Sequence, residues 1–158
     1  MKRNAWSLIV GGCMLAAVAA CSKSEPLAPE LKQAMEARHE GFEAIGDAMK
    51  KIADTLKAGG SLNPELAAAA ATIKQHSGEL VDWFPAGTGP ESGRKTEAKA
   101  EIWQQPEVFA EKREAFVAEA AKLAALADAN DAEGFAGQVK NLGGTCKGCH
   151  DDFRAKDK

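Results

Sequence analysis

The sequence predicts an all-α protein, an antiparallel four-helix bundle with a long crossover between its second and third helices. In four segments the apolar residues recur at alternating spacings of four and three, which is the period of packed helices. Alanine is abundant, tyrosine is absent, and no run of β-branched residues alternates with polar ones. Short connections between most of these segments favour antiparallel neighbours in a bundle.

Two helices are expected in the first half of the chain. The first begins near Pro29 and ends at Gly59–Gly60, and the second begins after Asn63 and runs to about Phe84. Pro64 falls in the first turn of the second helix, where its missing N–H costs nothing. The inward-facing seams are predicted to consist of Leu31, Met35, Arg38, Phe42, Ile45, Met49, Ile52 and Leu56, then Leu66, Ala70, Ile73, Ser77, Leu80 and Phe84.

Two more helices are expected in the second half, from Pro106 to about Asn130 and from about Ala132 to Arg154. The glycine-rich crossover over residues 85–101 precedes them. A loop of that length is unusual in a bundle and often has a function. The seams of these helices are predicted to consist of Phe109, Arg113, Phe116, Ala120, Leu123 and Ala127, then Phe135, Val139, Leu142, Cys146, Cys149 and Phe153.

The start of the chain is predicted to be a signal peptide. Residues 1–20 combine Lys2 and Arg3 with an apolar run that is too short and wrongly flanked for a stable membrane span. Residues 21–30 are a polar tether, and residues 31–158 form the bundle. Without Lys2 and Arg3, the 20 basic side chains of the sequence become 18 against 23 acidic ones, a formal charge of −5. That balance disfavours a nucleic-acid partner.

The end of the signal resembles a bacterial lipobox. In the stretch VAAC, cleavage before Cys21 leaves a cysteine that carries acyl chains, so Cys21 is the expected lipid attachment site. The alternative is a conventional signal peptide that is cleaved after Ala20 and leaves Cys21 as an ordinary thiol without lipid. Ser22 follows, and in lipoproteins a residue other than aspartate there favours the outer membrane. The expected location is therefore the periplasm, with the lipid at the outer membrane.

The stretch CKGCH near the C-terminus is typical of covalent attachment of one haem c. Cys146 and Cys149 are the expected thioether-forming residues, and His150 is the expected axial ligand of the iron. Residues three apart lie on one helical face, so both thiols can point at one macrocycle. A redox dithiol or a zinc site is the alternative.

Arg38 breaks the apolar pattern of the first seam. A buried guanidinium without a partner is costly, and a haem propionate is a suitable partner because arginine binds carboxylates through paired donors. The alternative is that Arg38 extends its charged end to solvent along the helix surface.

From Leu31 to Lys158 the chain resembles the class II c-type cytochromes, the cytochrome c′ family. FPAGTG at residues 84–89, EIW at 101–103, Phe109 with Phe116, and CKGCHDDFR at 146–154 carry the resemblance. It implies a four-helix bundle with one haem c near the C-terminus. It also implies that Arg38 and Arg154 lie near the haem, and that the protein forms a homodimer through its first two helices.

The resemblance also bears on the open face of the iron. Low-spin members carry an iron-binding methionine four residues after the first arginine, whereas high-spin members carry a non-ligating residue there. Phe42 occupies this position, which implies five-coordinate, high-spin iron with His150 as the sole protein ligand. The alternative is a six-coordinate low-spin electron carrier that uses His39 or a shifted methionine. Met35 and Met49 each lie seven residues from Phe42, about 10.5 Å along a helix.

The predicted function is periplasmic electron transfer, nitric oxide binding, or both, with no enzymatic activity. An apolar pocket at Phe42 offers bound dioxygen no hydrogen bond, while nitric oxide depends less on such help. A peroxidase-like enzyme is a further alternative, although it would normally need a distal acid–base residue. The sequence identifies no redox partner.

Overall fold

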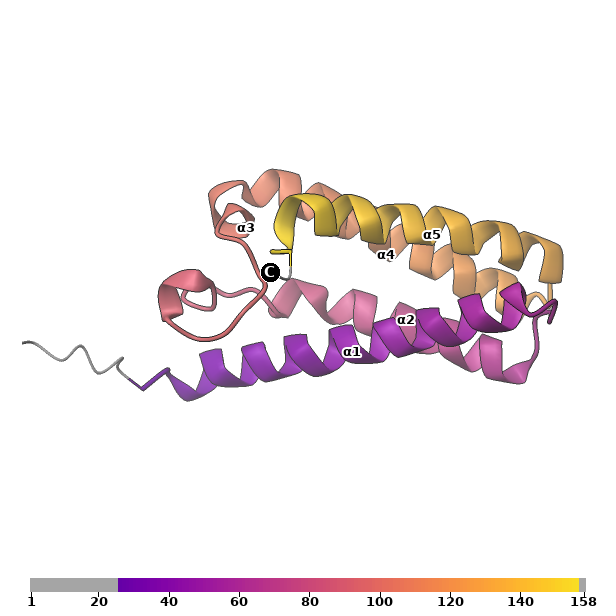
Figure 1. Cartoon of the computed structure of the whole chain (residues 1–158), viewed down its shortest axis with the longest axis horizontal. Coiled ribbons are helices and arrows are strands. Elements are labelled where there is room, and N and C mark those ends of the chain that lie inside the picture. The colour runs from indigo at the N-terminus through magenta and orange to yellow at the C-terminus, as the bar shows by residue number, and fades with distance from the viewer. Residues whose placement is uncertain (1–25, 157–158) are drawn as a thin grey trace, which may run out of the picture.

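The computed structural model describes residues 26–156 and shows an antiparallel four-helix bundle, as predicted (Figure 1). The long helices are α1 (Pro29–Lys57), α2 (Pro64–Glu79), α4 (Pro106–Asp128) and α5 (Ala132–Phe153). The predicted signal peptide, the lipid site at Cys21 and half of the tether fall outside the described residues, and the domain boundaries stay predictions. Within residues 26–156, no helix is long and apolar enough to span a bilayer.

Local capping explains where two of these helices begin. The side chain of Asn63 accepts hydrogen bonds from the backbone N–H groups of Glu65 (2.9 Å) and Leu66 (3.1 Å), and so satisfies donors that the first turn of α2 leaves free. Asp131 does the same for Gly134 at the start of α5, at 2.9 Å. These two short side chains fix the starts of α2 and α5 as the sequence predicts.

The second half of the fold has more short helices than predicted. α2 ends at Glu79 rather than near Phe84, and a 3₁₀ turn, η1 (Leu80–Asp82), continues the chain. The crossover contains another 3₁₀ turn, η2 (Pro90–Ser92), and one turn of helix, α3 (Glu101–Gln104). η2 and α3 belong to no long apolar period and were not predicted, whereas η1 falls inside the helix that was expected to run to about Phe84.

The helix seams form the core. The main buried cluster runs the length of the bundle and includes Ile52, Ile73, Leu123, Phe135 and Leu142, all fully buried. Burying side chains of this size contributes about 1.5–3 kcal/mol each. A second cluster at the crossover end consists of Ile102, Phe109 and Phe153. α3 therefore matters to the fold, because it delivers Ile102 to the end of α5.

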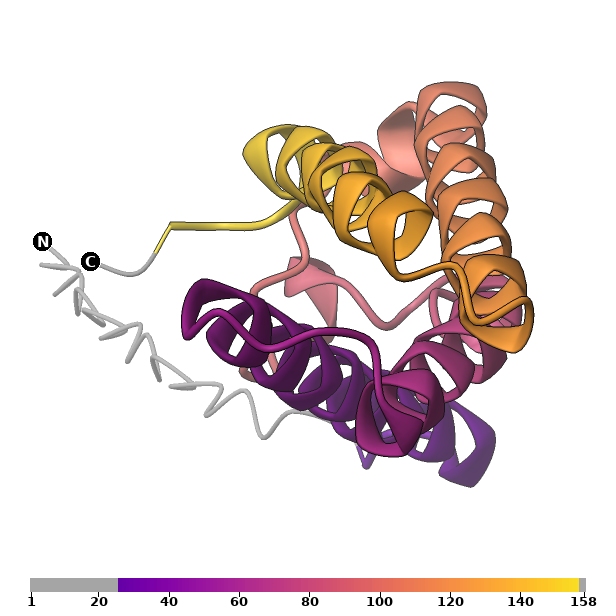
Figure 2. The same cartoon turned by 90° about the vertical axis from the view of Figure 1, so that its right-hand side faces the viewer.

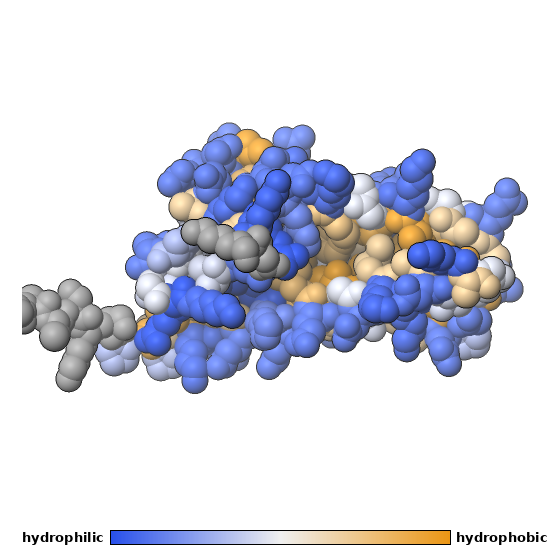
Figure 3. Space-filling view, viewed as in Figure 1, coloured by the Kyte–Doolittle hydropathy of each residue, from blue (hydrophilic) through white to orange (hydrophobic). Residues whose placement is uncertain are grey.

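One edge of the bundle is more open than the others. Figure 2 shows α1 beside α2, α2 beside α4, and α4 beside α5, whereas α1 and α5 touch far less. Apolar surface is visible in the hollow between α1 and α5 (Figure 3). Several seam residues of these two helices stay partly exposed, namely Phe42, Met49, Leu56, Val139, Cys146 and Cys149.

Candidate functional site

The CKGCH motif occupies the last two turns of α5. Cys146 packs against the main core cluster, and Cys149 packs against the second cluster. Both are free thiols and both are half-buried. The two thiols therefore face the interior of the bundle from one side of α5.

The surroundings of the two thiols disfavour the redox-dithiol alternative. Burial raises the pKa of Cys146, and burial likewise raises the pKa of Cys149 against a weaker opposing effect of Lys112. A reactive dithiol needs at least one cysteine with a lowered pKa, because the thiolate is the nucleophile. Both thiols are instead kept protonated at neutral pH.

The ring of His150 faces the ring of Phe42, which comes from α1. Their centroids lie 6.5 Å apart with the planes at 74°. His150 is exposed on one side, but the burial of its other side lowers its pKa, and the nearby charge of Arg154 lowers this pKa further. The neutral imidazole is the form that binds metal ions, so these surroundings suit a ligand.

Phe42 belongs to an aromatic cluster that lines the interior near His150. Its ring lies 5.2 Å from that of Trp83 and 6.2 Å from that of Phe84, both edge-on. Gly41 permits this packing, because a Cβ there would stand 2.1 Å from the indole of Trp83. The indole of Trp83 therefore requires glycine beside Phe42, and no pattern in the sequence indicates this contact.

Arg38 is buried, with 7% of its surface exposed, so the alternative in which it reaches solvent is wrong. Its guanidinium donates to the carbonyl oxygens of Thr88 (3.0 Å) and Trp83 (3.5 Å) and to the hydroxyls of Thr88 (3.4 Å) and Thr96 (3.2 Å). It also lies 5.0 Å from the ring centroid of Phe84. Burial lowers the pKa of Arg38 from a value so high that the group stays charged.

The partners of Arg38 all belong to the crossover and the turn before it. Within the described residues no carboxylate forms an ion pair with it, so a propionate as partner stays a prediction. The guanidinium instead links α1 to the crossover through its hydrogen bonds with Thr88, which is fully buried. Neither residue pattern nor spacing signals these loop partners, since they depend on the path of the crossover.

Replacing Arg38 with methionine should destabilise the fold by about 3 kcal/mol, because buried carbonyl and hydroxyl groups of the crossover lose their donors. Urea denaturation of the purified protein measures this difference. Arg94→Met is the matched control, since Arg94 is exposed and lies in the same crossover, and it should change stability by less than about 0.5 kcal/mol. Equal effects of the two variants would contradict the assigned role of Arg38.

Arg154 directly follows α5 and is half-exposed. Its Nε donates to Oε2 of Glu97 at 2.7 Å, and its backbone pairs with Ala98 in an isolated β-bridge. Arg154 and Lys156 border a small hollow of about 260 Å³ beside His150. Arg154 thus lies near His150, although its carboxylate partner is Glu97, a pairing that no pattern in the sequence indicates.

The other histidines lie away from the ring of His150. The His39 side chain is 82% exposed and lies 4.0 Å from a carboxylate oxygen of Glu43, on the outer face of α1. His76 is partly buried, bonds to Glu79 at 2.8 Å, and its ring centroid lies 6.2 Å from that of Trp83. Neither one shares the position opposite His150 that Phe42 occupies.

The residues present fit a haem. Two protonated thiols and a neutral imidazole lie on one side of α5, and aromatic rings face them from α1 and the turn before the crossover. The apolar hollow between α1 and α5 runs alongside this site (Figure 3). A flat apolar macrocycle with one metal ligand suits that set of groups.

Comparisons with known proteins agree with this geometry. The family model for cytochrome c′ matches residues 33–154. Cytochrome c′ of Pararhodospirillum photometricum is 40% identical over 122 residues, which cover 76% of this chain and 94% of that protein.

Two solved structures are similar in fold. The structure of a cytochrome c′ with an unusual ligand-controlled dimer dissociation has a TM-score of 0.70 and 31% identity, and covers 83% of this chain and 99% of that one. The nitric oxide complex of a mutant cytochrome c prime from Alcaligenes xylosoxidans has a TM-score of 0.71 and 25% identity, and covers 82% and 99%.

Proposed function

This chain belongs to the cytochrome c′ family, and on that premise we propose that it is a mono-haem cytochrome with five-coordinate, high-spin iron. Proteins of this family carry one covalently attached haem c. Cys146 and Cys149 form the two thioethers, and His150 is the axial ligand. When bound, the haem supplies an iron centre that exchanges electrons and takes up diatomic ligands.

The observation that carries this proposal is the position of Phe42 opposite His150, 6.5 Å away between ring centroids. A phenyl ring has no atom that ligates iron, and Trp83 and Phe84 surround it with further apolar surface. The chain thus supplies one imidazole on one side of the iron and a closely packed apolar wall on the other side. A six-coordinate carrier would require His39 to leave the outer face of α1, or Met35 or Met49 to reach the iron from about 10.5 Å along that helix.

The activity that fits this site is electron transfer, nitric oxide binding, or both, without catalysis. Phe42 offers no acid–base group for a peroxidase-like reaction. The nitric oxide complex of a similar cytochrome c prime supports a gas-binding role by analogy. The physiological redox partner is left unassigned.

Exposing the reduced protein to nitric oxide and, separately, to dioxygen tests this function. The optical spectrum should change at once with nitric oxide, and dioxygen should give no stable complex, because an apolar wall offers it no hydrogen bond. A spectrum that nitric oxide leaves unchanged would contradict an open iron face.

We further propose that Cys21 anchors the protein in the outer membrane, facing the periplasm. Support comes from the sequence alone, since the lipobox-like stretch lies outside the described residues. Cys21→Ala should release the protein from the membrane fraction into the soluble fraction of cells. Unchanged membrane association after this substitution would rule out Cys21 as the anchor.

A homodimer through α1 and α2 is the proposed assembly. It rests on the family resemblance and on the ligand-controlled dimer dissociation described for one similar cytochrome c′.

A further inference from the structure

The C-terminal end of α5 is completed by a residue from the crossover. The last four carbonyls of a helix have no partner within it. In α5, His150 O accepts from the backbone N–H of Arg154 at 3.1 Å, and the other three carbonyls all accept from Lys99. The Nζ of Lys99 donates to Asp151 O (3.1 Å) and Asp152 O (2.9 Å), and the backbone N–H of Lys99 donates to Phe153 O (3.0 Å).

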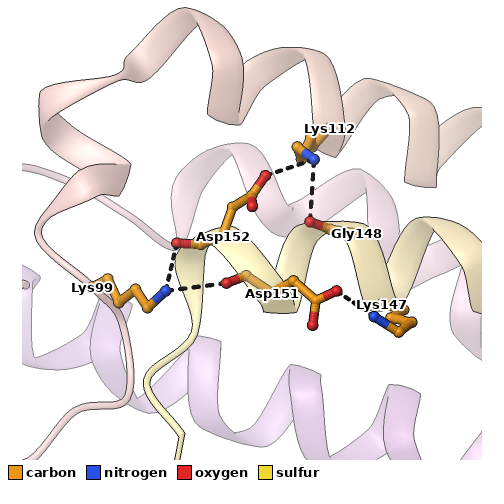
Figure 4. Close-up of polar contacts among 6 residues, drawn as sticks. All are labelled: Lys99, Lys112, Lys147, Gly148, Asp151 and Asp152. Atoms are coloured by element: carbon orange, nitrogen blue, oxygen red, sulfur yellow. Dashed lines mark hydrogen bonds and ion pairs between the residues drawn. The ribbon is translucent and has the colours of Figure 1, made fainter.

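A second lysine reaches the same turn from the opposite side. Lys112 of α4 donates from Nζ to the carbonyl of Gly148 at 3.2 Å and pairs with Oδ2 of Asp152 at 2.7 Å. Figure 4 shows Lys99 and Lys112 approaching α5 from different directions. Their carbonyl partners precede His150 by two residues and follow it by one, two and three.

The helix at this point has little intrinsic stability. Gly143 and Gly144 lie two turns before His150, and a Cβ at either position would meet no neighbouring atom within 4 Å. No protein contact of the described residues requires glycine at either position, and each glycine costs a helix about 1 kcal/mol relative to alanine. Contacts from outside α5 are therefore needed to hold its last turn in one orientation.

We propose that Lys99 and Lys112 are positioning residues for His150. Given the function proposed above, the two lysines hold the backbone on both sides of the axial ligand. They thereby set the direction of the His150 ring toward the iron. Positive charge at a helix C-terminus also favours the helical conformation of this turn. The two lysines act through the backbone of α5 and touch neither iron nor bound gas.

The chain supplies a matched control in Lys147. This lysine also lies in the motif region, and its ammonium pairs with the carboxylate of Asp151, one turn along the same helix (Figure 4). It is 76% exposed and bonds to a carboxylate rather than to a carbonyl of α5. Removing Lys147 thus takes away one positive charge near His150 while the backbone contacts of Lys99 and Lys112 remain.

The experiment compares Lys99→Met, Lys112→Met and Lys147→Met in the haem-loaded protein. Amide hydrogen exchange of residues 151–155 measures how firmly the last turn is held, and resonance Raman spectroscopy of the reduced protein reports the iron–histidine stretching band. Lys99→Met and Lys112→Met should each speed exchange by about tenfold or more and shift or broaden the band. Lys147→Met should leave both unchanged, and Lys112→Arg should restore most of the wild-type behaviour.

Three outcomes would overturn the proposal. Unchanged exchange in Lys99→Met and Lys112→Met would show that neither lysine holds the turn. Faster exchange with an unaltered iron–histidine band would make both lysines structural only. If Lys147→Met had the same effect as Lys99→Met and Lys112→Met, the cause would be the loss of a positive charge near His150 and not the loss of contacts with the backbone of α5. A wild-type protein without an iron–histidine band would instead contradict the proposed function, and hydrogen exchange would still test the contacts of the two lysines.

Discussion

Replacing Cys146 and Cys149 together with serine should abolish covalent haem attachment completely. Serine keeps the size of each side chain but cannot form a thioether, and both positions face the interior where the haem is expected. Intact-mass measurement under denaturing conditions separates attached from merely bound haem. The wild type should carry the added mass of one haem, and the double variant should carry none.

Thr145→Ala is the matched control for this experiment. Thr145 is next to Cys146 on α5, and its hydroxyl donates a hydrogen bond to Leu142 O in the same helix, at 2.8 Å. This variant should retain the full added mass. Covalent haem in the double variant would mean that another residue forms the attachment, and the assignment of the CKGCH motif would be wrong.

Phe42→Met should convert most of the iron from five-coordinate high-spin to six-coordinate low-spin. The methionine side chain would start from the position that faces His150, and its flexible thioether is a ligand that haem iron accepts. Optical and magnetic circular dichroism spectra of the oxidised and reduced protein measure the spin state.

Phe42→Leu provides the comparison, since leucine is apolar and cannot ligate iron. This variant should stay high-spin and should bind gases faster than the wild type, because a smaller side chain opens the wall beside Trp83 and Phe84. A methionine variant that remains high-spin would show that position 42 does not face the iron. His39→Ala should leave the wild-type spectrum unchanged, whereas a change would favour the six-coordinate alternative.

The bundle itself was predictable because its information is local. The four-and-three spacing of apolar residues marks the buried face of each long helix, and residues such as Asn63 and Asp131 cap helix starts within three positions. The short helix α3 and the turn η2 were missed, since one turn of helix leaves no period to detect. Their positions depend on tertiary contacts such as that of Ile102 with the second core cluster.

The site was predictable in its residues but not in their partners. Arg38 stands out in an apolar seam, and its burial follows from that position, but its bonds to Thr88 and Thr96 depend on the fold of the crossover. No motif or spacing in the sequence distinguishes Lys99 and Lys112 from other lysines. Their contacts with the end of α5 join residues 36 or more positions apart, which no local pattern encodes.

The coordination of the iron is the central claim, and resonance Raman spectroscopy of the reduced wild-type protein tests it most directly. The structure pairs one imidazole, His150, with the phenyl ring of Phe42. We therefore predict the marker bands of five-coordinate high-spin haem together with an iron–histidine stretching band. Marker bands of six-coordinate low-spin haem in the wild type would contradict it, because they would require a second protein ligand where Phe42 lies.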